Sequence, residues 1–133
     1  MASSRLLLLD TNILLAALIN PKTLPAATRQ QLEATSNSVL FSAASIWEIA
    51  IKSSLKRDDF DFQSSDIQRL AEQTGFDELP ILSNHCHGVA DLPWHHRDPF
   101  DRLLIAQAQS VNADFLTRDS TLAVYSDLVK IVD

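Results

Sequence analysis

The sequence predicts an α/β fold with a mainly parallel sheet. Short apolar runs that suit buried strands alternate along the chain with longer segments of helical character. Parallel strands need a crossover connection, which is usually a helix, so this alternation is typical of a parallel sheet. At 133 residues the chain is long enough to bury one sizeable core, and we expect a single domain over residues 1–133.

The first strand is expected over residues 6–9. This run is continuously apolar and ends at the polar Asp10, which suits a central strand buried on both faces of the sheet. Helical spacing follows over residues 13–19. Pro21 and Pro25 indicate that this helix has ended, because proline cannot continue a helix.

A second strand and two helices are expected in the middle of the chain. Residues 39–41 form a short apolar run, and a helix is expected from about residue 46 to residue 55. A charged link over residues 56–61 separates it from a polar helix over residues 65–74. Gly75 is the expected stop of that helix, since glycine commonly follows a helix end.

The last part of the chain repeats the alternation. Residues 79–82 suit a short strand, and apolar positions recur at helical spacing over residues 100–111. Residues 113–116 are expected to form another strand, residues 120–125 a short helical turn and residues 128–132 a final strand.

Composition limits the class of protein. Cys86 is the only cysteine, so no disulfide can form within the chain, and a reducing, cytoplasmic compartment is expected. Polar residues 10–12 interrupt the first apolar stretch, which argues against a signal peptide or a membrane span. The net charge of −6 argues against a broad basic face for nucleic acid. Cations bound to converging acids would weaken this objection, because they invert the local field.

Four carboxylates are expected at the edge of the sheet where ligands bind. Asp10 closes the first strand, Glu48 lies early in the helix after the second strand, Asp101 opens the long later helix, and Asp119 follows the strand over residues 113–116. Four acids in one crevice repel one another unless a cation lies between them. Mg²⁺ or Mn²⁺ prefers such oxygen ligands and can activate water for phosphodiester hydrolysis.

Each acid also has a purely structural interpretation. Residues 45–48 match a capping box, and Glu48 could pair with Lys52 one turn later. Asp98 followed by Pro99 is typical of a helix start, which would place Asp101 in the favoured first turn. The remaining two acids, Asp10 and Asp119, could cap the elements that follow them.

Four blocks of sequence resemble the PIN-domain family and, within it, the VapC-like toxins of type II toxin–antitoxin systems. The blocks are LLDTN at residues 8–12, SIWEIAIK at 45–52, HRDPFDRLLIA at 96–106 and TRD at 117–119. They occur in family order and span nearly the whole chain. The resemblance implies a three-layer α/β/α sandwich with a mainly parallel central sheet.

The resemblance also implies a site and an activity. It implies a Mg²⁺- or Mn²⁺-dependent endoribonuclease that cleaves single-stranded or looped RNA and leaves a 5′-phosphate. The implied metal ligands are Asp10, Glu48, Asp101 and Asp119. Two further polar positions, Asn12 and Thr117, are expected to orient carboxylates or metal-bound water. Asp98 is expected to act as a helix cap with an additional role outside the metal ligands.

Basic residues beside the quartet are candidate phosphate contacts: Lys52, Arg97, Arg102 and Arg118. Their ordinary alternative is a solvated place on a helix face, and Arg102 could instead pair with Asp98. A VapC-like protein is further implied to be a homodimer. It would be held by an antitoxin whose arginine enters the acidic crevice, a partner suited to the charge of −6. Maturation of RNA by a PIN nuclease that is not a toxin is the alternative.

Three rival interpretations are weaker. A phosphatase of the haloacid dehalogenase type would use Asp10 as nucleophile, but Asn12 stands where a second aspartate is expected. A catalytically silent α/β binding module would use its acids only as caps. Zinc is a poor match, because the His and Cys residues are crowded in sequence: His85, Cys86, His87, His95 and His96. His96 is instead expected to help shape the site, and Trp47 and Trp94 to serve packing or subunit contacts.

Overall fold

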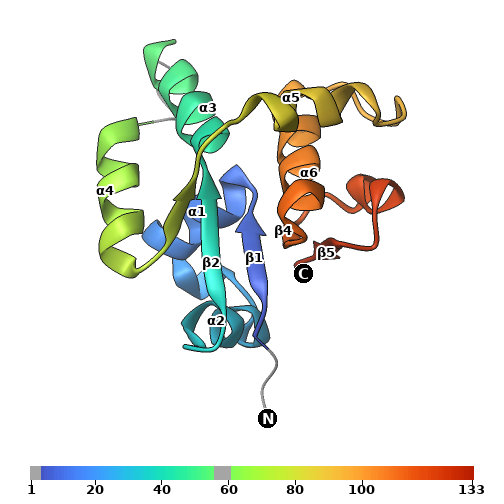
Figure 1. Cartoon of the computed structure of the whole chain (residues 1–133). Helices are drawn as coiled ribbons and strands as arrows, with labels where there is room; N and C mark the ends of the chain where they lie inside the picture. The colour runs from blue at the N-terminus through green and yellow to red at the C-terminus, as the bar shows by residue number, and fades with distance from the viewer. Residues whose placement is uncertain (1–3, 56–60) are drawn as a thin grey trace.

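The computed structural model describes residues 4–55 and 61–133, which form one parallel sheet with helices on both faces. The strand order is β3-β2-β1-β4-β5, and every neighbouring pair is parallel. The strands are β1 (Leu6–Leu9), β2 (Ser38–Ser42), β3 (Asp77–Leu79), β4 (Asp114–Thr117) and β5 (Val129–Ile131). The first strand is therefore the centre of the sheet (Figure 1).

The central strand is buried on both faces, as its apolar run predicts. Leu7, Leu8 and Leu9 are each 0% exposed. Because successive side chains of a strand point to opposite faces, Leu7 and Leu9 belong to one core cluster and Leu8 belongs to the other.

The helices complete three layers. They are α1 (Thr11–Ile19), α2 (Ala26–Glu33), α3 (Ala43–Ser54), α4 (Ser64–Thr74), α5 (Ser83–Ala90) and α6 (Pro99–Val111), with 3₁₀ turns η1 (Pro21–Thr23) and η2 (Ser120–Tyr125). Ile13 of α1 and Ile67 of α4 pack in the cluster of Leu7 and Leu9, whereas Leu104 of α6 packs in that of Leu8. The expected α/β/α sandwich is thus confirmed, with α4 and α6 on opposite sides of the sheet (Figure 1).

Local sequence explains several helix ends. Asp98 caps α6, because its Oδ1 accepts hydrogen bonds from the backbone N–H groups of Phe100 and Asp101, and Pro99 occupies the first helical position. Gly75 ends α4 in the left-handed conformation with φ +98°, as expected. The start of α6 is thereby fixed, and with it the place of Asp101.

Three sequence expectations are corrected. Helix α3 begins at Ala43 rather than near residue 46, because Ser42 is its N-cap and accepts from the N–H of Ala44. The capping box at residues 45–48 therefore does not form. Helix α2 is not predicted from the sequence, because there Pro25 indicates only that the preceding helix has ended. In the structure Pro25 is the N-cap of α2. The strand expected over residues 79–82 ends at Leu79, because Pro80 has no N–H for the ladder, and α5 follows.

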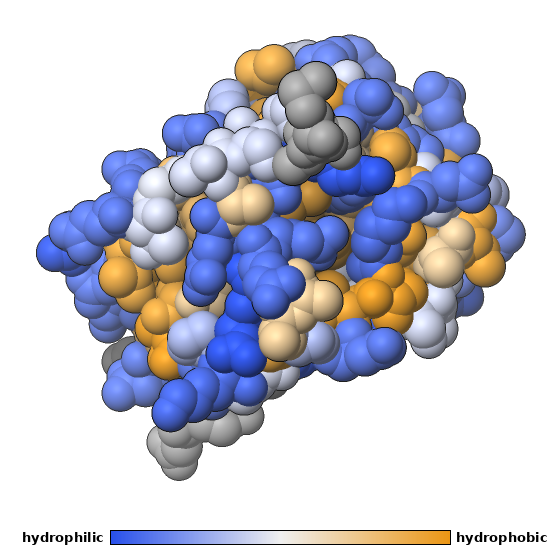
Figure 2. All heavy atoms as spheres, turned by 90° about the horizontal axis from the view of Figure 1, so that it is seen from below, coloured by the Kyte–Doolittle hydropathy of each residue, from blue (hydrophilic) through white to orange (hydrophobic). Residues whose placement is uncertain are grey.

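Two further sequence expectations concern the charged link after α3 and the absence of a membrane span. Most of the charged link over residues 56–61 falls on residues 56–60, outside the described residues. None of the helices in the described ranges has the length and apolarity to cross a bilayer. Seen from the end of the sheet where the strands begin, the surface is largely hydrophilic, with smaller hydrophobic areas between (Figure 2). The carboxyl ends of the strands lie at the opposite end.

Candidate active site

Asp10 lies directly after the central strand and is held from two directions. Its Oδ1 accepts from the backbone N–H of Ile13 at 2.8 Å, so it caps α1, as the structural interpretation predicts. Its Oδ2 accepts from the hydroxyl of Thr117 at 2.6 Å. Thr117 ends β4, which pairs with β1, so the sheet itself brings together two residues 107 positions apart. Thr117 thus contacts the carboxylate of Asp10, and its predicted orienting role at a metal site stays a prediction.

Glu48 lies on the second turn of α3 and has a partner on each oxygen. Its Oε1 accepts from the hydroxyl of Thr11 at 2.6 Å, and its Oε2 lies 3.1 Å from Nζ of Lys52. Thr11 is also 2.9 Å from the hydroxyl of Ser45. The ion pair with Lys52, expected one helical turn later, therefore forms. Because Lys52 pairs with Glu48, it lies at the acidic site.

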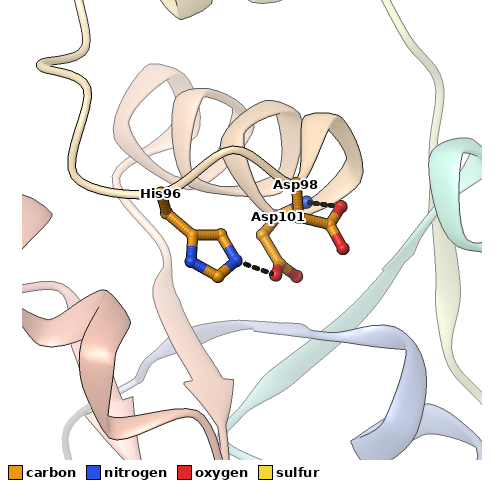
Figure 3. Close-up of side chains that lie close together, drawn as sticks. All are labelled: His96, Asp98 and Asp101. Atoms are coloured by element: carbon orange, nitrogen blue, oxygen red, sulfur yellow. Dashed lines mark hydrogen bonds and ion pairs between the residues drawn. The ribbon is translucent and has the colours of Figure 1, made fainter.

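Asp101 lies in the first turn of α6, where the helix dipole favours an acid. Its Oδ2 lies 3.0 Å from Nε2 of His96, whose ring points toward it (Figure 3). Among the described residues, His96, Asp98 and Asp101 form a group whose candidate ligand atoms all lie within 4.8 Å of one another. The N-terminus of α6 therefore gathers a nitrogen and two carboxylates at one place.

Asp119 follows β4 and caps η2. Its Oδ1 accepts from the backbone N–H and the hydroxyl of Thr121, at 3.0 and 2.6 Å. Its own N–H donates to the hydroxyl oxygen of Thr117 at 3.1 Å. Since Thr117 also donates to Asp10, one threonine connects the ends of β1 and β4.

The pKa values show which acids influence one another. Burial raises the pKa of Asp10, and the negative charge of Glu48 raises it further, while hydrogen bonds from Thr117 and Ile13 oppose the rise. Burial first, and then the charges of Asp98 and Asp10, raise the pKa of Asp101 to about 6, although His96 opposes this. Repulsion between acids therefore couples Asp10 both to Glu48 and to Asp101.

Asp119 behaves differently from the other acids. Hydrogen bonds from Thr121 lower its pKa, and the nearby His96 lowers it as well. His96 thus faces both Asp101 and Asp119. The expected quartet gathers at one end of the sheet, but within the described part of the chain it is spread more widely than the group of His96, Asp98 and Asp101. The hydroxyls of Thr11 and Thr117 bind two of its carboxylates, those of Glu48 and Asp10.

Arg102 does not have the place expected of a phosphate contact. It is 3% exposed, and its guanidinium donates to the carbonyls of Val89, Leu92 and Pro93 and to the hydroxyl of Tyr125. The alternative pairing with Asp98 is also replaced by these bonds. Because one side chain satisfies a carbonyl in the last turn of α5 and two carbonyls of the segment that follows, Arg102 fixes this part of the chain to α6.

Three further side chains that were candidates for orienting the site or for binding phosphate are exposed: Asn12, Arg97 and Arg118. Asn12 is exposed, and its influence on Asp10 comes from its backbone N–H, which lowers the pKa of that acid. Arg118 is exposed and donates to the carbonyl of Thr23 in η1. Arg97 is exposed next to His96.

The histidines considered for zinc have other surroundings. His85 is 1% exposed, and its Nδ1 accepts from the backbone N–H of Leu82 and lies 3.4 Å from Nε2 of Gln107. The ring of His95 packs edge-on against Tyr125, with centroids 5.3 Å apart.

Sequence reasoning did not assign a role to two residues that bind the carboxylates, Thr11 and Thr121, and it did not predict the bond between Ser45 and Thr11. The only signal in the sequence is closeness, since Thr11 follows Asp10 and Thr121 lies two positions after Asp119. Closeness identifies hydroxyls that can reach an acid, but it does not say which acid. Thr11 binds Glu48 rather than its neighbour Asp10.

A family model described as the PIN domain matches residues 7–128, and this range includes all four acids of the quartet. The chain belongs to the PIN-domain family. No significant match was found among curated proteins.

The PIN domain is similar in fold to chains of three solved complexes. VapBC2 from Rickettsia felis, bound to a DNA fragment from the promoter, matches with a TM-score of 0.69 and 17% identity over 96% of this chain and 99% of that chain. VapBC-1 from nontypeable Haemophilus influenzae matches with a TM-score of 0.62 and 19% identity over 94% of this chain and 99% of that chain. A toxin–antitoxin complex from Klebsiella pneumoniae matches with a TM-score of 0.58 and 21% identity over 87% of this chain and 89% of that chain. At these identities the similarity is one of fold.

The donor set of this PIN domain fits a hard divalent cation. The quartet offers carboxylate oxygens, which Mg²⁺ and Mn²⁺ prefer. Burial and mutual repulsion raise the pKa of Asp10 and of Asp101, and a cation between them would relieve that repulsion. His96 adds a single nitrogen, which is directed at a carboxylate.

Proposed function

We propose that this PIN domain is an endoribonuclease that depends on Mg²⁺ or Mn²⁺, and that it is the toxin of a toxin–antitoxin pair. The observation that supports the activity best is the gathering of four acids near the carboxyl ends of β1 and β4, on the second turn of α3 and on the first turn of α6. Asp10 and Asp101 have raised pKa values there. The fold similarity to three toxin–antitoxin complexes supports the toxin assignment.

The residues proposed to hold the cations are Asp10, Glu48, Asp101 and Asp119. Bound cations would acidify a water and stabilise the charge that develops on the phosphate and the leaving oxygen. The chain itself holds the carboxylates in place. Thr117 donates to Asp10, Thr11 donates to Glu48 and Thr121 donates to Asp119. His96 orients Asp101 from the side opposite the helix.

Asp98 and the basic residues near the acids complete the proposal. Asp98 caps α6 and also faces Asp101, so it combines a structural role with an effect on the charge of the site. Lys52 is the proposed phosphate contact, because its ammonium group lies 3.1 Å from an oxygen of Glu48. The proposed substrate is single-stranded or looped RNA, and the proposed product carries a 5′-phosphate.

The proposed partners are an antitoxin and a second copy of the chain, in the cytoplasm. An antitoxin arginine placed among the acids would add positive charge and reduce the repulsion between them. Support for a homodimer comes from Trp47 and Ile51 of α3 and from Leu55, its C-cap, which are exposed at intervals of four residues. Next to Trp47 lies an apolar pocket of about 260 Å³, lined by Trp47, Cys86, Val89, Pro99, Phe100 and Leu103.

The activity is tested with purified protein, free of any partner, on a panel of single-stranded and hairpin RNAs. We expect cleavage with Mg²⁺ or Mn²⁺, none with EDTA, and loss of cleavage in Asp10→Asn and Asp101→Asn while the circular dichroism spectrum stays unchanged. Asp77→Asn is the matched control, because Asp77 is an exposed acid at the start of β3, away from the site. Failure of the wild-type protein to cut any RNA with either ion would favour the silent binding module.

A covalent phosphatase mechanism is less well supported, because Asn12 stands where such an enzyme would have its second aspartate. A trapped aspartyl phosphate at Asp10 would reverse this preference.

A further inference from the structure

Two buried hydroxyl groups connect α1 to α3 beneath the acidic site. Thr11 is the first residue of α1 and is 5% exposed, and Ser45 is the third residue of α3 and is 0% exposed. The hydroxyl of Thr11 lies 2.9 Å from that of Ser45 and 2.6 Å from Oε1 of Glu48. These three groups form a short series of hydrogen bonds that runs from the core to a carboxylate of the proposed site.

The number of available hydrogens fixes which group donates in each of these hydrogen bonds. An ionised carboxylate can only accept, so the O–H of Thr11 donates to Glu48. Thr11 has a single O–H, and the hydroxyl of Ser45 must therefore donate to the oxygen of Thr11. The distance of 2.6 Å to Glu48 is typical of a hydroxyl bound to a charged oxygen.

This series of hydrogen bonds lies directly beside Asp10, whose side chain is itself held in place. Thr11 follows Asp10 directly, and Asp10 is fixed by its bonds to Ile13 and Thr117. Glu48 lies 37 residues later and has a longer side chain with more rotatable bonds. Its other partner, Lys52, has a side chain that is 40% exposed and provides a weaker restraint. Thr11 is therefore the buried restraint that relates Glu48 to Asp10.

We infer that Thr11, supported by Ser45, is a positioning residue that holds the carboxylate of Glu48 in the orientation in which the site binds a divalent cation. The inference rests on the proposed function, because it concerns the cation site that the proposed nuclease uses. Removal of a group that orients a metal ligand typically weakens metal affinity by about 10-fold to 100-fold.

The test is the affinity for Mn²⁺, measured by the electron paramagnetic resonance signal of the free ion. Thr11→Val removes the hydroxyl and keeps the shape of the side chain, and we expect affinity to fall about 10-fold or more. Thr11→Ser keeps the hydroxyl and should restore affinity to within about 3-fold of the wild-type value. Ser45→Ala should weaken binding by a smaller factor. Thr28→Val is the matched control, because Thr28 is a buried threonine on α2, with 7% exposure.

A double-mutant cycle separates positioning from a general effect on folding. If Thr11 acts through Glu48, Thr11→Val should weaken Mn²⁺ binding little further in a Glu48→Gln background. Equal affinity of Thr11→Val and the wild type would overturn the inference and leave the proposed function intact. A wild-type protein that does not bind Mn²⁺ would overturn both. If Thr11→Val does not fold, Ser45→Ala decides, and an unchanged affinity in that variant would count against the inference.

Discussion

Replacing Asp101 by asparagine should make the metal-free protein more stable at neutral pH, although it removes a proposed catalytic ligand. The folded structure raises the pKa of this acid from 3.8 to about 6, first through burial and then through the charges of Asp98 and Asp10. A shift of about two units corresponds to about 3 kcal/mol of unfavourable ionisation at pH 7. Asparagine has nearly the same shape, can still meet His96 and carries no charge.

The expected gain is smaller than this upper bound. The side chain of Asp101 is 24% exposed, so solvent screens part of the repulsion. An acid in the first turn of a helix also contributes about 0.3–1 kcal/mol of favourable interaction that asparagine loses. About 1–2 kcal/mol remains. For 133 residues the entropy of unfolding is about 0.28 kcal/mol/K, so the melting temperature should rise by about 4–7 °C.

The pH dependence follows from the direction of the shift. Because the pKa of Asp101 is higher in the folded state, the wild-type protein has the full benefit of the protonated acid below about pH 4 and loses it as pH rises through 6. The advantage of Asp101→Asn should therefore open between pH 4 and pH 6 and stay constant above. Thermal unfolding in EDTA over this range, followed by circular dichroism, measures it.

A control with the opposite sign is present in the same site. Hydrogen bonds from Thr121 lower the pKa of Asp119, so Asp119→Asn should give no stabilisation at pH 7. The reasoning fails if Asp101→Asn melts at or below the wild-type temperature at pH 7, or if its gain is the same at pH 4.5. Saturating Mg²⁺ should stabilise the wild type more than the variant, which would narrow the difference.

Three further substitutions test the fold around the site by urea denaturation. Arg102→Met should cost about 3 kcal/mol, because three carbonyls and the hydroxyl of Tyr125 lose a buried donor, and a cost below about 1 kcal/mol would contradict this role. Asp98→Ala should cost about 1 kcal/mol through loss of the cap of α6, and an unchanged midpoint would show that the cap contributes nothing. Gly75→Ala should cost about 1 kcal/mol through its φ of +98° alone, since no atom lies within 4 Å of the added Cβ, and a stabilised variant would refute this.

The central strand β1 was predictable because its burial on both faces leaves a direct mark on the sequence, whereas the mostly exposed β3 was predicted to begin two residues too late. Leu7, Leu8 and Leu9 are all apolar since the sheet is covered on both sides. Helices α2 and α5 left no such mark. Helix α5 buries His85, a polar residue whose bond to the backbone of Leu82 satisfies it, and no apolar spacing reveals that arrangement. Pro25 could be assigned to a loop or to a helix start, and only packing decides between them.

The acids were predictable in place but not in their bonding. Asp10, Asp101 and Asp119 follow strands or open helices, and each also caps an element or lies in its first turn. The structural interpretation is therefore confirmed for these acids, and their role as metal ligands stays a prediction. Arg102 shows the limit of such reasoning: a charge beside an acid in sequence points about 100° away from it on a helix, here into the protein rather than toward the site.

The order of the strands has a consequence for the newly made protein. The central strand comes first in the chain, but its partner β4 is completed only at Thr117, and the bond between Thr117 and Asp10 spans 107 residues. During synthesis the chain must wait for its last quarter to leave the ribosome before the two halves of the site can meet. An incomplete chain would carry Asp10 and Glu48 without Asp101 and Asp119. The four acids would thus belong to one folded domain only after translation of this domain is nearly finished.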